Sequence, residues 1–154
     1  MPIISDEKSW YPLIFVGVIY LFYKDYQKAS LLVLMILLAL GISDFLTGHI
    51  LKPLLARLRP CHALQGVHLL VGCSDSFSLP SAHAANSAAI STVICYEYRK
   101  IIIAMAIVVL LVCYSRAYLG VHYPFDVLMG MISGVAYGLM VIEGKKGLMR
   151  YKKL

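Results

Sequence analysis

Residues 29–51, ASLLVLMILLALGISDFLTGHIL, form an almost continuous apolar run in which Asp44 is the only charged side chain. A bilayer core about 30 Å thick is crossed by roughly 20 helical residues, so this run predicts a transmembrane helix. Residues 124–142 form a second run of sufficient length. Three shorter runs, at residues 83–98, 101–114 and, more weakly, about 10–23, need their flanks or a tilt to cross. The sequence therefore predicts an all-α, polytopic transmembrane bundle of about five helices.

The composition agrees with that class, because 60% of the residues are hydrophobic and 14% are charged. No repeat, low-complexity run or linker divides the chain, so residues 1–154 are expected to form a single integral-membrane domain. Small residues at helical spacing in the last helix predict a face for close helix packing. They are Gly130, Ser133, Gly134 and Gly138.

The formal net charge of +6 does not predict a nucleic-acid partner, because much of it is concentrated at the end of the chain. A basic cluster directly after an apolar helix is typical of a juxtamembrane anchor on the lipid bilayer. This cluster comprises Lys145, Lys146, Arg150, Lys152 and Lys153.

Basic residues near helix ends also mark the cytoplasmic face of a membrane. Lys24 and Lys28 follow the first predicted helix, Arg99 and Lys100 follow the third, and the basic tail follows the fifth. With five crossings, all three positions fall on one side. We therefore predict a multi-pass protein of the inner (cytoplasmic) membrane with an external N-terminus and a cytoplasmic C-terminus. Residues 59–80 and 120–123 then face the periplasm or exterior.

Two of the four cysteines, Cys61 and Cys73, lie in the predicted external segment, where disulfides persist. The sequence does not fix the geometry that a disulfide needs. A Cys61–Cys73 bridge and two free thiols therefore both remain open. Cys95 and Cys113 lie in apolar helices and are interpreted as core residues.

Residues 52–60, KPLLARLRP, place cations at the outer end of the second helix. Lys52 and Arg59 are two helical turns apart, so they project from one face if the helix continues past Pro53. Two cations on one face suit a polyanion. The alternative interpretation is that these side chains, including Arg57, only extend to the membrane interface.

Pro80-Ser81-Ala82-His83 comes directly before the third helix. Serine is a favoured N-cap, so Ser81 is expected to begin that helix. The first amide groups of the helix and the positive end of its dipole then form an anion site. His83 would stand beside a bound phosphate and could donate a proton to it. Alternatively, it is an interfacial histidine with no such role.

Residues 115–126, SRAYLGVHYPFD, join the fourth and fifth helices. Pro124 fits the first position of a helix, which leaves His122 just outside that helix and Asp126 in its first turn. A carboxylate there can accept a hydrogen bond from one imidazole nitrogen and leave the other as a nucleophile. Alternatively, Asp126 is only a favourable charge at a helix start.

These three clusters together resemble the tripartite motif of the type 2 phosphatidic acid phosphatase family, kin to vanadium haloperoxidases. The matching residues are Lys52-x6-Arg59-Pro60, Pro80-Ser81-Ala82-His83 and Ser115-Arg116-x5-His122-x3-Asp126. The resemblance implies a helical bundle and a membrane lipid phosphatase. One position departs from the family, because Ala82 stands where glycine is usual and its methyl group crowds an amide that would meet phosphate.

The resemblance also implies a role for each matching residue. His122 resembles the nucleophile that takes the phosphoryl group through a phosphohistidine, and Asp126 resembles the group that orients it. His83 resembles the general acid that protonates the leaving oxygen and then the base that activates water. The implied phosphate-binding residues are Lys52, Arg59, Ser81, Ala82 and Arg116.

No metal or other cofactor is expected. Asp44 is isolated in its helix, and His49, His62 and His68 match no common zinc spacing. Asp44 itself either reaches toward the basic cluster as a supporting partner or stays hydrated near the membrane interface.

The expected partner is a lipid phosphate or pyrophosphate in the external leaflet. The small size and the R-x-R-P-C-H segment at residues 57–62 look most like bacterial lipid A 1-phosphatases. Undecaprenyl pyrophosphate and phosphatidylglycerophosphate phosphatases are the alternatives. A non-catalytic lipid transporter or structural membrane protein is the alternative from another class. The sequence does not predict the oligomeric state.

Overall fold

The computed structural model describes residues 11–64 and 72–151, and within these ranges every regular element is a helix. The helices are α2 (Tyr11–Lys24), α3 (Tyr26–Asp44), the π-helix η2 (Phe45–Leu51), α4 (Lys52–Leu55), α5 (Pro60–Ala63), α6 (Ala82–Glu97), the 3₁₀-helix η3 (Arg99–Ile101), α7 (Ile102–Tyr118) and α8 (Pro124–Tyr151). Each of the five apolar runs therefore forms a helix. The predicted all-α class is confirmed for the described residues.

By length and apolar composition, three segments can cross a membrane: Tyr26–Ala63, Arg99–Tyr118 and Pro124–Tyr151. Helices α2 and α6 are shorter, with 14 and 16 residues. Large apolar side chains cover the outside of the bundle, among them Leu13, Phe15, Leu37, Ile103 and Leu139. Lipid tails are the natural solvent for such a surface, as expected for a membrane protein.

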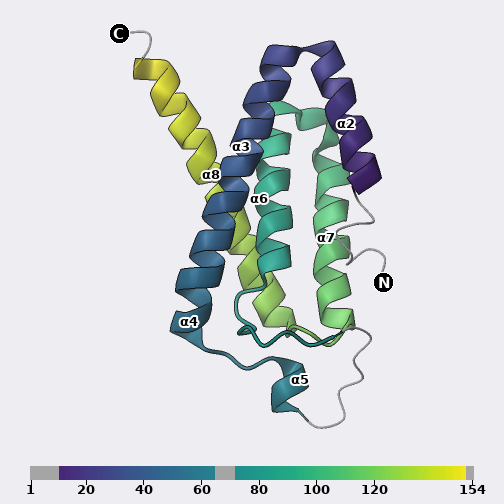
Figure 1. Ribbon diagram of the computed structural model, residues 1–154, viewed down its shortest axis with the longest axis vertical. Coiled ribbons are helices and arrows are strands. Elements are labelled where there is room, and N and C mark those ends of the chain that lie inside the picture. The colour runs from purple at the N-terminus through teal and green to yellow at the C-terminus, as the bar shows by residue number, and fades with distance from the viewer. Residues whose placement is uncertain (1–10, 65–71, 152–154) are drawn as a thin grey trace.

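Helix α6 occupies the centre of the bundle, between α3, α7 and α8 (Figure 1). Its small side chains Ala85 and Ala89 are fully buried and pack against side chains from two neighbouring helices. These neighbours are Leu32, Met35 and Ala39 of α3 and Tyr137, Val141 and Ile142 of α8. An alanine-rich face lets the surrounding helix backbones approach closely.

The predicted small-residue face of the last helix packs on α6. A Cβ atom added at Gly130 would collide with the Ser81 carbonyl oxygen, and one added at Gly134 would lie 2.8 Å from the Ala85 carbonyl carbon. At Gly138 it would lie 2.7 Å from Cβ of Thr92. The three glycines therefore set the distance between α6 and α8. This contact matters for the site, because α6 and α8 both begin there.

Helix α8 is longer than predicted, since it continues past residue 142 to Tyr151 and includes most of the basic tail. Lys145 pairs there with Glu97 at the end of α6, and Lys146 pairs with Glu143. These ion pairs, together with the helix propensity of lysine, favour continuation of the helix. Lys152 and Lys153 lie outside the described residues.

The two ends of the bundle differ in chemistry. The links from α2 to α3 and from α6 to α7 lie at the end where α8 finishes (Figure 1). Lys24 ends α2, Lys28 lies in the first turn of α3, and Arg99 and Lys100 belong to η3. At the opposite end, α4 and the end of α7 lie near the starts of α6 and α8 (Figure 1). The three predicted motif clusters therefore meet at one end of the bundle.

Candidate active site

Six of the predicted site residues line one cavity of about 220 Å³ at this end of the bundle. They come from all three sequence clusters and are Lys52, Arg59, Ala82, His83, Arg116 and His122. Gly72, Ser74, Ser76 and Val121 complete the lining. Both predicted histidines thus face the same space, together with three cationic side chains. Ser81 and Asp126, the other two predicted residues, are fully buried beside this lining.

Lys52 and Arg59 reach the cavity by a route other than the predicted one. Helix α4 ends at Leu55, because Ala56 adopts a left-handed conformation with φ of 43°, and Arg59 follows in an extended segment. The helical-face argument for this pair was therefore wrong. The reversal at Ala56 turns the chain back, so that Arg59 joins Lys52 at the cavity.

Ser76 holds the two cations in place. Its carbonyl oxygen accepts from Arg59 Nε at 2.7 Å, and its hydroxyl oxygen accepts from Arg59 Nη2 at 2.8 Å and from Lys52 Nζ at 3.4 Å. Arg59 is 7% exposed and Lys52 is 8% exposed. Among the described residues no carboxylate forms an ion pair with either cation, and two largely buried cations favour the binding of an anion between them.

A disulfide joins Cys61 to Cys73, which resolves the alternative that the sequence left open. It ties the start of α5 to the segment that contains Ser74 and Ser76. Arg59 lies two residues before one half-cystine and Ser76 three residues after the other. The disulfide therefore fixes the partner of Arg59 close to it.

His122 is 4% exposed and contacts a different group at each ring nitrogen. Its Nε2 lies 3.4 Å from Arg59 Nη1, and its Nδ1 lies 3.3 Å from the Ser78 hydroxyl. Burial, followed by the positive charges of Arg59 and Lys52, lowers the pKa of His122 from 6.5 to about 3. The ring is therefore neutral at neutral pH, which is the form that can act as a nucleophile.

Asp126 is fully buried, and three donors surround its carboxylate. Arg57 Nη1 donates to Oδ1 at 2.7 Å, while the Tyr123 amide donates to Oδ2 at 3.1 Å and the Ser78 hydroxyl also donates to Oδ2. The expected direct hydrogen bond to His122 is not formed, since Nδ1 and Oδ2 are 3.9 Å apart. Ser78 lies between the two groups instead.

Arg57 does more than extend to the membrane interface, which was the only role that the sequence suggested for it. Besides its ion pair with Asp126, its guanidinium lies 4.2 Å from the centre of the Tyr123 ring. Through these two contacts, Arg57 holds the start of α8 in place.

Ser81 begins α6 as predicted, with an extended N-cap conformation. Its amide donates to the Asp126 carbonyl oxygen at 2.9 Å, which ties the starts of α6 and α8 together. Its hydroxyl is buried and makes no hydrogen bond to any described residue. Ala82 and His83 follow in the first turn and line the cavity.

Asp44 does not reach the basic cluster. It accepts a hydrogen bond from Asn86 Nδ2 at 2.8 Å, and Asn86 in turn accepts from the Ser43 hydroxyl at 2.6 Å. This polar network joins α3 to α6 next to the π-helix η2. The second alternative for Asp44, a hydrated group near the interface, agrees with its exposed position.

Within the described ranges, one group of side chains is close enough to share a metal ion: Cys61, His62 and Cys73. The two sulfur atoms are bonded to each other, so they are not available as thiolate ligands in this state. His49 is stacked on Phe45 in η2, far along the chain from this group. His68 lies outside the described residues.

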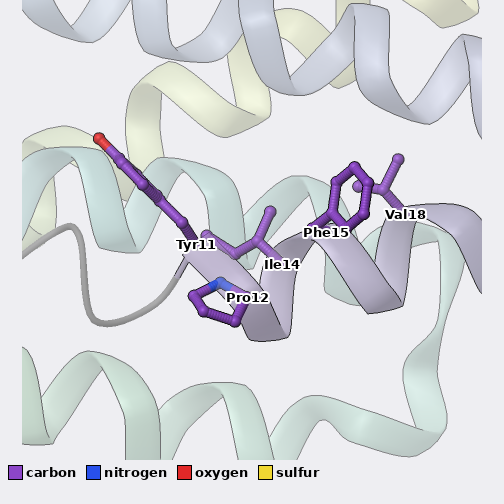
Figure 2. A pocket seen from close by; sticks show the side chains of 5 residues that line it. All are labelled: Tyr11, Pro12, Ile14, Phe15 and Val18. Atoms are coloured by element: carbon purple, nitrogen blue, oxygen red, sulfur yellow. The ribbon is translucent and has the colours of Figure 1, made fainter.

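A larger hollow of about 490 Å³ lies along α2 (Figure 2). Its lining comes from Tyr11, Pro12, Ile14, Phe15 and Val18. Apart from the Tyr11 hydroxyl, these side chains carry no group that could act on a phosphate. The cationic cavity is therefore the candidate active site.

Sequence reasoning missed three residues of this site: Arg57, Ser76 and Ser78. Ser78 lies three residues before Ser81, inside the F-S-L-P-S-A-H stretch, so its closeness to the predicted histidine motif was an available signal. Arg57 and Ser76 gave no comparable signal, because their contacts depend on the reversal at Ala56 and on the disulfide.

A family model described as the PAP2 superfamily matches residues 14–149. Among curated proteins, the lipid A 4'-phosphatase of Bacteroides thetaiotaomicron is 31% identical over 143 residues, which cover 87% of this chain and 63% of that protein. The undecaprenyl-diphosphatase of Sulfolobus acidocaldarius is 32% identical over 130 residues, covering 83% of this chain and 59% of that protein.

Among solved structures, the chain is similar to the transmembrane PAP2 type phosphatidylglycerolphosphate phosphatase from Bacillus subtilis. The TM-score is 0.68 at 26% identity, and the match covers 95% of this chain and 74% of that one. The chain spans about three fifths of the length of the curated relatives that it matches.

Proposed function

The chain belongs to the PAP2 superfamily, and from that membership we propose that it is a metal-independent membrane phosphatase that removes phosphate from a lipid phosphate or pyrophosphate through a phosphohistidine. One observation carries the proposal: three clusters that are far apart in sequence line a single cationic cavity with two imidazoles. A non-catalytic transporter has no need for this arrangement, and no observation favours it.

Phosphoryl transfer depends mainly on positioning and on stabilisation of negative charge at the equatorial oxygens. Lys52, Arg59 and Arg116 supply that charge stabilisation from the cavity wall. Arg59 is held in position by Ser76 and by the Val121 carbonyl oxygen, which accepts from Nη1 at 3.1 Å. Cations fixed in advance need little reorganisation when the transition state forms.

In the first step, Nε2 of neutral His122 attacks phosphorus. An N–P bond forms as the bond from phosphorus to the leaving oxygen breaks. His83, whose protonated form is favoured by the negative charge of the bound phosphate, donates a proton to that oxygen. The pKa of His122, lowered to about 3, supports its role as the nucleophile. His83 lines the same cavity at the start of α6, where it would face the leaving oxygen.

In the second step, His83 accepts a proton from water, and the water oxygen attacks the phosphohistidine. The N–P bond breaks, inorganic phosphate is released and His122 returns to its neutral form. Both histidines thereby regain their starting protonation states, so the cycle balances.

The size of the cavity limits which part of a substrate it can hold. At about 220 Å³ it is smaller than the roughly 300–1,000 Å³ of typical ligand pockets. A phosphate group fits, while the sugar, glycerol or prenyl chain that carries it stays outside. We keep lipid A as the first candidate, at its 1- or its 4'-phosphate. Undecaprenyl pyrophosphate and phosphatidylglycerophosphate are the next candidates.

We also propose that the site faces the external side of the inner membrane and that residues 1–154 act as one domain. The basic links with Lys24, Lys28, Arg99 and Lys100 lie at the other end of the bundle (Figure 1). Basic loops favour the cytoplasmic side. A core shared by α3, α6 and α8 supports a single domain.

The test is phosphate release by the purified protein from each lipid measured side by side, with lipid A labelled separately at its two phosphates. We expect hydrolysis of at least one lipid without added metal and in the presence of a chelator. His122→Ala should abolish it, and His83→Ala should slow it by roughly a hundred- to ten-thousand-fold, the usual contribution of general acid–base catalysis. Near-normal activity of folded His122→Ala protein would refute the mechanism.

A further inference from the structure

The Ser78 hydroxyl lies between the carboxylate of Asp126 and the ring of His122. It donates to Asp126 Oδ2 and lies 3.3 Å from His122 Nδ1, whereas the carboxylate oxygen and Nδ1 are 3.9 Å apart. We propose that Ser78 is the positioning residue through which Asp126 orients His122 and keeps the proton on Nδ1, so that Nε2 is presented as the nucleophile. This inference rests on the proposed function.

The hydrogen-bond directions around the ring allow one arrangement. A guanidinium only donates, so Nε2, 3.4 Å from Arg59 Nη1, must present its lone pair. In a neutral ring the proton then sits on Nδ1. An ionised carboxylate only accepts, so the Ser78 proton points to Asp126 and the lone pairs of its oxygen accept from Nδ1–H. In the hydrogen-bond series Asp126–Ser78–His122–Arg59, every donor therefore faces an acceptor.

The serine is itself held in place. Ser78 is fully buried, and its amide donates to the Arg57 carbonyl oxygen at 2.8 Å. The side chain of the same Arg57 binds the other carboxylate oxygen of Asp126 at 2.7 Å. Arg57 thus positions both the serine and the aspartate. With Asp126 oriented from both sides, the bridging hydroxyl has little freedom to leave the histidine.

This arrangement predicts a specific defect when the hydroxyl is removed. Ser78→Ala leaves the charge of Asp126, the phosphate-binding cations and the backbone contact of residue 78 with the ring in place, but it removes the hydroxyl that accepts from Nδ1–H. The proton can then move to Nε2, and the tautomer that cannot attack becomes populated. We expect kcat to fall by roughly ten- to a hundredfold, because a wrongly oriented histidine is a poor nucleophile. KM should stay within about twofold, since the cavity cations are unchanged.

The experiment compares Ser78→Ala, Ser78→Thr and Ser87→Ala proteins in lipid nanodiscs. Ser87 is the matched control, because it is a partly buried serine of α6 whose hydroxyl donates to the nearby Ala84 carbonyl oxygen. Steady-state kinetics are measured with the best lipid substrate. In parallel, nitrogen NMR of histidine-labelled protein reports which ring nitrogen of His122 carries the proton, with the signal assigned by its loss in His122→Gln.

The predicted result is a kcat loss and a mixed His122 tautomer in Ser78→Ala, partial recovery of both in Ser78→Thr, and wild-type behaviour in Ser87→Ala. Unchanged kcat with a single Nδ1–H tautomer in Ser78→Ala, while His122→Ala is inactive, would overturn the role of Ser78 and leave the proposed function standing. A wild-type protein that hydrolyses none of the lipids would instead refute the function. If Ser78→Ala does not fold, Ser78→Cys provides the same comparison, since its thiol is a weak acceptor of similar size.

Discussion

At the residue scale, the proposed mechanism requires the proton of the neutral His122 ring on Nδ1 and a free lone pair on Nε2. Nε2 must be unprotonated to attack, yet it lies in a cavity that contains Lys52, Arg59 and Arg116. These cations disfavour a positive charge on the His122 ring, and burial of the ring acts in the same direction. In the proposed mechanism, the charges that bind phosphate therefore also keep His122 neutral before the substrate arrives.

This coupling predicts the titration of His122. Because its pKa is lowered from 6.5 to about 3, the ring should remain neutral down to about pH 5 in the empty protein. Lys52→Gln removes a positive charge from its surroundings and should raise the pKa of His122 toward 6.5. Lys28→Gln, at an exposed position in α3, is the control. Histidine NMR signals followed against pH provide the measurement.

The same shift has a consequence for stability. A histidine whose folded pKa lies below its unfolded value takes up a proton more readily in the unfolded chain. The folded protein should therefore lose stability as the pH falls below 6.5, and His122→Ala should weaken that dependence. A His122 midpoint near 6.5, or a midpoint unchanged by Lys52→Gln, would contradict this electrostatic account.

At the element scale, the disulfide and the contact between α6 and α8 position the site. Cys73→Ser opens the bridge to Cys61 and loosens the segment that carries Ser76, the hydrogen-bond partner of Arg59. A hydrogen bond to a charged group contributes about 1.5–3 kcal/mol, so a partial loss should raise KM by roughly tenfold. We expect kcat to fall as well, because Arg59 also stabilises charge in the transition state and contacts Nε2 of His122.

Kinetics of Cys73→Ser and Cys95→Ser proteins, with and without a dithiol reductant, test this role. Cys95 is a free cysteine of α6 and serves as the control. Reductant should raise the KM of the wild-type and Cys95→Ser proteins to the Cys73→Ser value and leave Cys73→Ser unchanged. A wild-type KM that does not respond to verified reduction of the bridge would show that the disulfide does not position Arg59.

The close packing of α6 and α8 gives a second prediction at this scale. Gly134→Ala adds a methyl group that meets the backbone of Ala85, and overpacking of this kind typically costs about 1–3 kcal/mol. Gly144→Ala on the same helix has no atom within 4 Å of the added Cβ and should be neutral or slightly stabilising. Thermal unfolding in detergent measures the difference. Equal melting temperatures for the two variants would mean that the helices are not held at this distance.

The five long helices were predictable, because each one contains an apolar run that is visible in the sequence. Most of the residues that line the cavity were predictable, because they belong to three motifs whose residue types and spacing are visible in the sequence. The helical-face argument for Lys52 and Arg59 nevertheless failed. The contacts of Arg57 and Ser78 with Asp126 were not predictable, since they join residues 69 and 48 positions apart. Such contacts depend on how the ends of α4, α6 and α8 come together, which no local pattern encodes.

At the scale of the whole molecule, the two ends of the bundle present different chemical groups. One end presents basic links and the ion pairs of Lys145 and Lys146. The other gathers the cavity and the disulfide, and many large apolar side chains are exposed along the helices between the two ends. Under the proposed function, a lipid substrate keeps its tail in the bilayer while its phosphate enters the cavity.

The most direct test of this account is to capture the phosphorylated enzyme. His83→Ala protein should accumulate the phosphorylated enzyme, because water is no longer activated for the second step. A lipid pyrophosphate is the substrate for this test, since its phosphate leaving group needs less help from an acid in the first step. Mass spectrometry after rapid quenching should then find an acid-labile phosphate on the peptide that contains His122, and none in protein that also carries His122→Ala. Hydrolysis without phosphate at His122, or with phosphate on another residue, would contradict the account.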